Sequence, residues 1–189
     1  MARSDIHLVS ETHAALNFRS VLQRLAGGVG VVTAGRDDTI DGVTVASFTS
    51  LSVNPPRLLI NLNRQSSLFP LIARDRCFGI NILGSDQQAI ADRFSSPELS
   101  GRQRFEGVVW SPGPTGVPLL KHAQVAVACE VDEIIERYTH AIIVGRPLAI
   151  ELSPRRSSLV YWNGQYVEID RDADLDLLAE VSIPLAHVR

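Results

Sequence analysis

The stretch that decides the fold is GVTVASFTSLSVNPP, residues 42–56, which carries five hydroxyl side chains and no charge. Read as one strand, it places Thr44, Ser50 and Ser52 on one face and Ser47 and Thr49 on the other. Neither face is then purely apolar, as a simple half-buried strand requires. Small side chains let a flat ligand approach the backbone, and hydroxyls with exposed N–H groups can bind phosphate without a lysine. An ordinary barrel strand rich in serine and threonine is the alternative interpretation.

The composition predicts one domain with a full-sized core, because the 189 residues are 45% hydrophobic and 21% charged. The net charge of −3 is scattered, so no basic field exists to hold nucleic acid or an anionic membrane. Cys77 and Cys129 lie far apart and are expected to be small buried hydrophobes rather than a disulfide or zinc site. The chain starts without a secretory signal and has no run of 18 apolar residues, which predicts a cytoplasmic protein.

Hydrophobic periodicity on either side of this stretch predicts many strands and few helices. Strands are expected at residues 29–35, 57–63, 77–83, 123–137, 139–152 and 159–169, and helices at 18–28, 67–76 and 86–94. Ser66 is expected to cap the second helix, and Ser85 with Gln88 to form a capping box on the third. Asn163-Gly164 predicts a tight hairpin. Turns join the strands too often for a parallel α/β sheet, so an antiparallel barrel with a few packed helices is expected.

Two further segments lie outside this pattern. Residues 95–118 are polar and interrupted by proline and glycine, which indicates a long structured loop. The tail from Asp170 is acidic, and its Leu175, Leu177 and Leu178 suggest a short peripheral helix.

The common catalytic and nucleotide-binding motifs are missing. Residues 28–33 fall one residue short of GxGxxG, and the order helix, glycines, strand is the reverse of a dinucleotide fold, which favours a helix C-cap. No P-loop, GxSxG or HExxH motif occurs, and the five histidines lack ligand spacing, so no metal site is predicted. Without an evident acid, base or nucleophile, any reaction is expected to be carried by a cofactor.

In the order of its segments, the chain resembles the flavin reductase family, FMN-binding split-barrel proteins that act as small components of two-component flavin monooxygenases. The matching segments, within residues 17–168, are FRSVLQRLAGGVGVVTA, GVTVASFTSLSVNPP, LLINLNRQSS, RCFGINIL, QQAIADRFSS, RFEGVVWSPGPTGVPLL, CEVDEIIERYTHAIIVGRP and LVYWNGQY. The resemblance implies a mainly β fold, an antiparallel split barrel of Greek-key type with a few peripheral helices. It would occupy residues 17–169, between an N-terminal extension (1–16) and the acidic tail (170–189).

The resemblance also implies which residues hold the two substrates. The flavin site would contain residues of the hydroxyl-rich stretch, two serines after the next strand and three residues of the CFGINIL strand. These are Thr44, Val45, Ala46, Ser47, Thr49, Ser50, Ser52, Ser66, Ser67, Gly79, Ile80 and Asn81. The backbone at 45–47 would face the isoalloxazine, and the serines would hold the ribityl chain and phosphate. His140 and Tyr166 would position the nicotinamide, although a hydrogen-bonded strand histidine is the alternative for His140. Where relatives often carry Gly-Asp-His, this chain has Tyr138-Thr139-His140.

The implied activity is that of an NAD(P)H:flavin oxidoreductase, a homodimer that passes reduced FMN or FAD to a partner monooxygenase. The alternatives are a flavin-binding module or carrier without turnover, and an enzyme like pyridoxamine-phosphate oxidase. The last requires a basic cluster for its substrate phosphate, which the hydroxyl-rich stretch lacks. Either Arg102 with Arg104 or Arg155 with Arg156 could bind the extra phosphate of NADPH, but solvated loop charges are the simpler interpretation, so NADH is expected. Neither the choice of flavin nor the partner's substrate follows from the residues.

Overall fold

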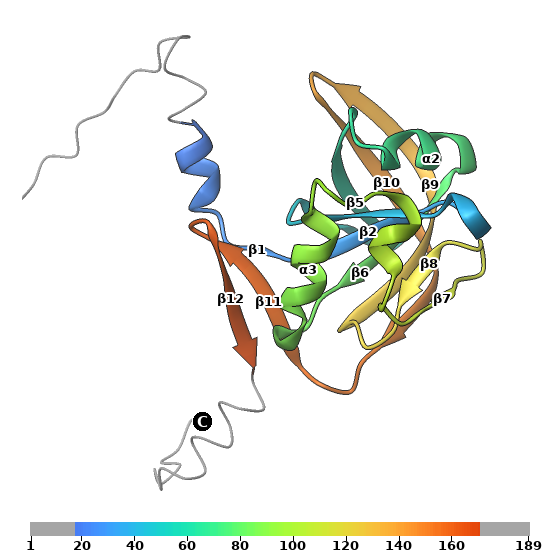
Figure 1. Ribbon diagram of the computed structural model, residues 1–189. Helices are drawn as coiled ribbons and strands as arrows, with labels where there is room; N and C mark the ends of the chain where they lie inside the picture. Colours follow the sequence, from blue (N-terminus) through green and yellow to red (C-terminus); the bar gives the residue numbers. More distant parts are fainter. Residues whose placement is uncertain (1–17, 171–189) are drawn as a thin grey trace, which may run out of the picture.

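The computed structural model describes residues 18–170, which form antiparallel sheets with a few short helices (Figure 1). The strands are β1 (Gly27–Gly28), β2 (Gly30–Ala34), β3 (Asp41–Val45), β4 (Phe48–Val53), β5 (Pro56–Asn63), β6 (Cys77–Ile82), β7 (Trp110–Pro112), β8 (Pro118–Leu120), β9 (Val125–Arg137), β10 (His140–Leu152), β11 (Ser157–Trp162) and β12 (Gln165–Asp170). The helices are α2 (Leu68–Asp75) and α3 (Gln88–Ser95), with 3-10 turns η1 (Asp37–Thr39), η2 (Ser85–Gln87) and η3 (Gly101–Phe105). Residues 18–23 are also helical.

The main sheet has seven strands in the order β3-β2-β6-β9-β10-β5-β4, so strands far apart in the chain become neighbours. The sheet bends around its apolar face into a split barrel, which confirms the predicted fold class. A second sheet, β1-β11-β12, forms an arm beside the barrel, and β7 pairs with β8 in a small hairpin (Figure 1). The long β9–β10 ribbon and the Asn163-Gly164 hairpin were both predicted correctly; Asn163 and Gly164 have φ of 52° and 82°, as a tight hairpin turn of this type requires.

Strand β2 divides the core into two parts. Val32 packs with Ile60, Phe78 and Ile143 inside the barrel, whereas the neighbouring Val31 joins a second cluster. That second cluster lies under α3, η3 and β11 and contains Phe94, Phe105 and Leu159 among others. Strand β2 is buried along its whole length. Because both of its faces are covered, its sequence does not alternate between apolar and charged residues.

The hydroxyl-rich stretch is two strands rather than one, and the single-strand interpretation was wrong. Strand β3 ends at Val45 and β4 begins at Phe48, and the two lie at opposite edges of the sheet order. The chain turns at Ala46 and Ser47, where the Ser47 carbonyl accepts a hydrogen bond of 2.8 Å from the Asn61 amide. Because alternation restarts after this turn, the faces expected for a continuous strand do not apply.

Smaller predictions about helix ends and loops were partly correct. Pro70 lies in the first turn of α2. The N-cap residue is Ser67 rather than the predicted Ser66, and its side chain makes no capping hydrogen bond, but the Leu68 amide donates to the Ser66 hydroxyl at 3.3 Å. The expected capping box of Ser85 and Gln88 is displaced by one residue: the Gln87 side chain accepts from the Gly84 amide at 2.9 Å. Residues 95–118 do form a structured loop, but it includes η3 and β7. The helix suggested at Leu175, Leu177 and Leu178 lies outside the described residues.

Candidate functional site

A cavity of about 320 Å³ lies between β3, the end of α3 and the β11–β12 arm. Its lining combines small or apolar residues of the barrel with two tyrosines of the arm. The lining residues are Val29, Thr44, Val45, Ala46, Ser95, Tyr161 and Tyr166. The structure therefore brings Tyr166, which the family resemblance assigns to the nicotinamide, together with Thr44, Val45 and Ala46, which it assigns to the flavin.

The aromatic wall of the cavity is built by the Asn163-Gly164 hairpin. Tyr161 and Tyr166 are direct cross-strand partners, and their rings meet edge to face with centroids 5.6 Å apart. Burial raises the pKa of the Tyr166 phenol, the charges of Asp92 and Tyr161 raise it further, and a hydrogen bond with Ser95 lowers it. Tyr166 is therefore neutral near pH 7 and presents an apolar ring with a polar tip to the cavity.

The opposite wall is formed by the end of β3. Gly27 of β1 allows the two strands to pack closely together at Ala46. A Cβ on Gly27 would lie 2.9 Å from the Ala46 carbonyl oxygen, which real side chains do not tolerate. Strand β1 can thus pass directly behind Ala46. Together with the small side chains at 44–46, this leaves a flat surface against which a planar ring can stack.

The five hydroxyls of the stretch are used in two different ways. Thr44 donates to the Ala91 carbonyl at 2.7 Å, and Ser47 donates to the Asn61 carbonyl at 2.9 Å. Thr49 makes a longer contact of 3.4 Å with the neighbouring Ser50 carbonyl. Within residues 18–170, the side chains of Ser50 and Ser52 make no hydrogen bond, and Ser50 is exposed. These two hydroxyls are therefore available to donate hydrogen bonds to a ligand.

Ser66 and Ser67 lie at the start of α2 and are already engaged. The Ser66 oxygen accepts from the Leu68 amide, and the Ser67 hydroxyl donates to Asp41 Oδ2 at 2.5 Å. Asp41 is only 4% exposed, and its other oxygen accepts from the Gly42 amide at 2.7 Å. Binding of a phosphate by Ser67, as predicted, requires its hydroxyl to turn away from Asp41.

The three residues predicted from strand β6 are buried within the sheet and do not line the cavity. Ile80 belongs to the barrel core, and a Cβ on Gly79 would lie 2.4 Å from the Thr33 hydroxyl. The Asn81 side chain is fully buried; it donates to the Val31 carbonyl at 3.0 Å and accepts from the Leu120 amide at 2.7 Å. These contacts connect β6 to β2 and β8.

His140 lies elsewhere, at the exposed start of β10, opposite Asn63 on one side and Arg137 on the other. Its Nδ1 is 2.8 Å from the Thr139 hydroxyl. His140 does not line the cavity that contains Tyr166, so the structure separates the two residues predicted for the nicotinamide.

Sequence analysis missed Tyr161, Ser95 and Val29 as parts of the cavity. Tyr161 could have been found, because it lies as far before the Asn163-Gly164 turn as Tyr166 lies after it, and tight hairpins pair such positions. Ser95 and Val29 carry no such signal, since their place depends on how α3 and β1 pack against β3.

The arginines considered for a 2′-phosphate are mostly engaged within the protein. Arg104 is buried against backbone carbonyls, Arg102 lies 3.3 Å from Asp38, and Arg155 pairs with Asp86 and Asp170 at 2.9 and 2.6 Å. Both cysteines are buried, as predicted, and burial raises the pKa of the Cys129 thiol to about 12. The Cys129 thiol is therefore protonated and unreactive near neutral pH.

The chain is similar to known proteins over most of its length. Residues 22–170 match the model of the Flavin reductase like domain. The chain is 34% identical over 152 residues to the reductase component of the FADH(2)-dependent resorcinol hydroxylase of Rhizobium sp. (strain MTP-10005), covering 79% of this chain and 84% of the relative. It is 30% identical over 151 residues to an FMN reductase (NADH) of Pseudomonas syringae pv. syringae (strain B728a), covering 80% and 84%.

Solved structures show the same likeness. The chain matches the NADH:FAD oxidoreductase of Streptomyces globisporus C-1027, solved in complex with NAD and FAD fragments, with a TM-score of 0.79 and 26% identity. The match covers 89% of this chain and 100% of the solved chain. Among residues 18–170, no helix has the length and apolar character needed to span a bilayer.

Proposed function

The chain belongs to the Flavin reductase like domain family, and from this premise we propose that it is an NAD(P)H:flavin oxidoreductase that supplies reduced flavin to a partner monooxygenase. The observation that carries the proposal is the cavity between β3 and the arm, which brings Thr44, Val45 and Ala46 together with two tyrosines. The hydroxyls of Ser50 and Ser52 on β4 lie outside this lining. The catalytic unit is assigned to residues 17–169, between the extension at 1–16 and the tail at 170–189. A cytoplasmic location, where NADH is produced, is part of the proposal.

The described residues fit a flavin. A planar ring can stack on the strand end at Thr44–Ala46, across from the ring of Tyr166. Ser50 and Ser52 lie outside the cavity lining and are proposed to donate to a phosphate that extends beyond it. A flavin held here would accept a hydride from the reduced nicotinamide, a reaction that needs no catalytic acid, base or nucleophile from the lining residues. The protein's own contribution is to bind and orient the two rings and to direct backbone N–H groups toward developing negative charge.

NADH is the proposed electron donor. Relatives named as an FMN reductase (NADH) and an NADH:FAD oxidoreductase support this choice. Arg102, Arg104 and Arg155 are engaged in ion pairs and carbonyl contacts, so a 2′-phosphate would depend on the exposed Arg156 alone among the four arginines considered. Both FMN and FAD are proposed as acceptors. Tyr166 is proposed to contact the nicotinamide in the cavity, and His140, which lies outside the cavity, to contact another part of the NADH molecule.

The test of the activity is NADH oxidation followed at 340 nm with purified protein, with FMN or FAD added in separate assays. We expect oxidation that depends on added flavin and leaves reduced flavin free in solution, with NADPH the poorer donor. No consumption of either nicotinamide with either flavin would overturn the enzyme assignment. Flavin binding without turnover would instead identify a carrier or binding module.

A homodimer is the proposed assembly. Phe18, Val21, Leu22 and Leu25 form an apolar stripe on and after the helical segment 18–23, and each is between 49% and 64% exposed. Within residues 18–170, strand β12 has a partner strand on one side only, and its Val167 and Ile169 are exposed as well. A second copy of the chain would cover both the stripe and the open edge.

The assembly is tested by sedimentation at micromolar concentration. We expect a dimer, and we expect Leu22→Glu to shift it toward monomer, because a charge within an apolar contact is costly. Arg19→Glu, on the same helical segment but outside the stripe, is the matched control. A wild-type monomer that retains full activity would contradict the proposal.

A further inference from the structure

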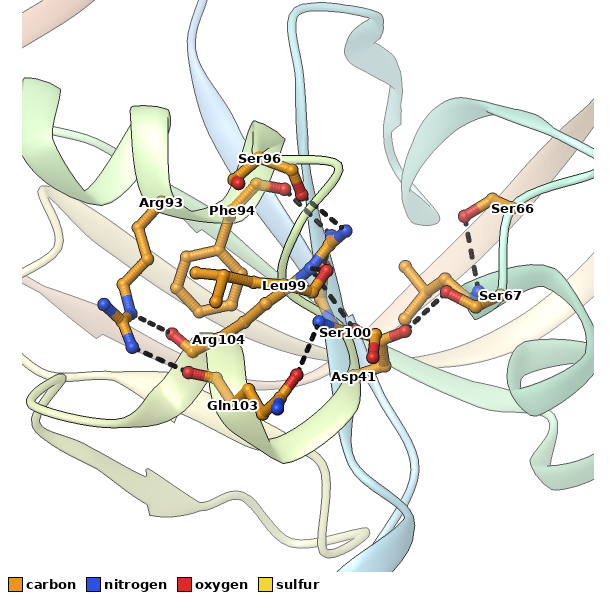
Figure 2. A network of polar contacts seen from close by, with 12 residues as sticks. Asp41, Ser66, Ser67, Arg93, Phe94, Ser96, Leu99, Ser100, Gln103 and Arg104 are labelled. Carbon is orange, nitrogen blue, oxygen red and sulfur yellow. Dashed lines mark hydrogen bonds and ion pairs between the residues drawn. The ribbon is translucent and has the colours of Figure 1, made fainter.

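Arg104, in η3, is a largely buried cation surrounded by backbone carbonyls. Its side chain is 12% exposed, and its guanidinium donates to the carbonyls of Phe94 at 2.9 Å, Leu99 at 2.9 Å and Ser96 at 3.2 Å, and also to that of Gly42. The Asp41 carboxylate lies 3.9 Å away. A buried charge is tolerated only when it is hydrogen-bonded and balanced, and both conditions are met here (Figure 2).

The carbonyls that Arg104 binds flank both walls of the cavity. Phe94 and Ser96 are the residues immediately before and after Ser95, which lines the cavity from the end of α3. Gly42 lies two residues before Thr44, which lines it from β3. One guanidinium therefore holds the chain on either side of Ser95 and the strand that leads to Thr44–Ala46.

Two other contacts show that this joint between β3 and α3 is closely fitted. The Thr44 hydroxyl donates to the Ala91 carbonyl of α3 at 2.7 Å. A Cβ on Gly42 would lie 2.7 Å from the Phe94 ring, so any larger residue at 42 would push the helix away from the strand. The distance between the end of α3 and β3 is thus determined by a small number of contacts. Most of the hydrogen bonds among them are made by Arg104.

Asp41 extends the same network to α2. Figure 2 shows Asp41 between Arg104 and Ser67, and the Ser67 hydroxyl donates to Asp41 Oδ2 at 2.5 Å. The network therefore joins Ser95 of the cavity to Ser67 at the start of α2, two positions on separate elements that the proposed flavin site needs in register.

We propose that Arg104 is a positioning residue that fixes the spacing between the Ser95 and Thr44–Ala46 walls of the cavity, and that this spacing sets the affinity for flavin. The proposal rests on the function proposed above. Arg104 contacts neither substrate in this role, since four of its five N–H donors are directed at the protein's own carbonyls. The guanidinium is needed because its fork of donors reaches several carbonyls at once, which a lysine ammonium on a flexible stem cannot do.

The test compares Arg104→Gln and Arg104→Lys with wild type and with Arg102→Gln as the matched control. Arg102 is on the same turn, but its side chain is 60% exposed and hydrogen-bonds to Asp37 and Asp38 at the surface. Flavin affinity is measured by fluorescence quenching without nicotinamide, and folding by circular dichroism. We expect Arg104→Gln to raise the flavin Kd about tenfold and Arg104→Lys to raise it less, because small displacements in a binding site have large effects. Arg102→Gln should match wild type.

Hydrogen–deuterium exchange provides a measurement that does not depend on flavin. In the Arg104 variants we expect faster exchange at residues 42–46 and 95–96 and unchanged exchange along β9 and β10. In kinetics, the KM for flavin should follow the Kd while the KM for NADH stays near wild type. If Arg104→Gln does not fold, the flavin Kd and the exchange rates of Arg104→Lys test the proposal instead.

Three outcomes separate the possibilities. Wild-type flavin affinity and wild-type exchange in the Arg104 variants would overturn the positioning role. A lower melting temperature with unchanged flavin affinity would also overturn it, since Arg104 would then be merely structural. A wild-type protein that binds no flavin would overturn the proposed function, and the role of Arg104 in flavin affinity with it, while exchange would still show whether Arg104 holds the joint.

Discussion

The two halves of the hydroxyl-rich stretch differ in what their side chains do. In the first half, Thr44 and Ser47 donate to backbone carbonyls at 2.7 and 2.9 Å, so their hydroxyls hold the fold together. In the second half, Ser50 and Ser52 make no side-chain hydrogen bond within the described part of the chain. A hydroxyl with a partner contributes to stability, whereas an accessible one without a partner can bind a ligand. Similar residues in two consecutive segments of the chain therefore have different tasks.

The residues proposed for the nicotinamide differ in the same way. Tyr166 belongs to the cavity, where it packs against Tyr161 and shares the lining with Ser95. His140 is exposed at the beginning of β10, and its side-chain contact is with its own neighbour, Thr139. Changes on the cavity side are thus expected to affect packing as well as binding, and changes on the exposed side to affect binding alone.

The largest effect is expected from Ser50→Ala or Ser52→Ala. Each removes a donor to the flavin phosphate, and a hydrogen bond to a charged group contributes about 1.5–3 kcal/mol. The flavin Kd should rise about tenfold or more, because about 1.4 kcal/mol corresponds to one decade. Titration of both variants with FMN and FAD measures this, and the melting temperature should stay at the wild-type value.

Thr44→Val is the contrasting variant. Its lost hydrogen bond to Ala91 should destabilise the protein by about 1 kcal/mol, which lowers the melting temperature by about 2–4 °C for a chain of this size. Unchanged flavin Kd in both serine variants, or an equal loss of stability in all three, would show that the two halves of the stretch do not differ in function.

The fold was largely predictable from the sequence, whereas the cavity was predictable only in part. Period-two patterns and the Asn163-Gly164 turn depend on local chemistry, and they gave β5, β6 and the β11–β12 hairpin correctly. The break at Ala46 and Ser47 was missed because both residues are compatible with a strand, and only the pairing of Ser47 with Asn61 shows the turn. Ser95 and the Arg104 network depend on packing between distant segments, for which one sequence carries no local signal.

The next largest effect is expected at Tyr166, on the cavity side. Tyr166→Ala removes a ring that can stack on a substrate, an interaction that contributes about 0.5–1.5 kcal/mol. The KM for NADH should rise about twofold to tenfold, and Tyr166→Phe, which keeps the ring, should stay closer to wild type. Steady-state kinetics at saturating flavin measures both. If Tyr166→Phe is as impaired as Tyr166→Ala, the hydroxyl and its contact with Ser95 matter more than the ring.

A smaller and more selective effect is expected at His140, on the exposed side. His140→Ala should raise the KM for NADH or lower kcat by a few-fold and leave the flavin Kd nearly unchanged. Because the residue is exposed, the melting temperature should not change. Weaker binding of both substrates together with a lower melting temperature would instead assign His140 a structural role at the end of a strand.

The smallest effect is a pH dependence of stability that only the cavity side should show. Burial raises the pKa of Tyr166 above its ordinary value of about 10. The folded state then holds the phenol proton more tightly than the unfolded state, so the stability from this group is fully present below about pH 10 and is lost as the pH rises through the folded pKa. Urea unfolding at about pH 8 and about pH 11 should therefore show a greater loss for wild type than for Tyr166→Phe. The buried Cys129 adds an alkaline loss of the same sign, but it is common to both proteins and cancels in the difference. Parallel losses in wild type and Tyr166→Phe would mean that the phenol is as solvated as an exposed tyrosine, and that the cavity is open to water on the Tyr166 side.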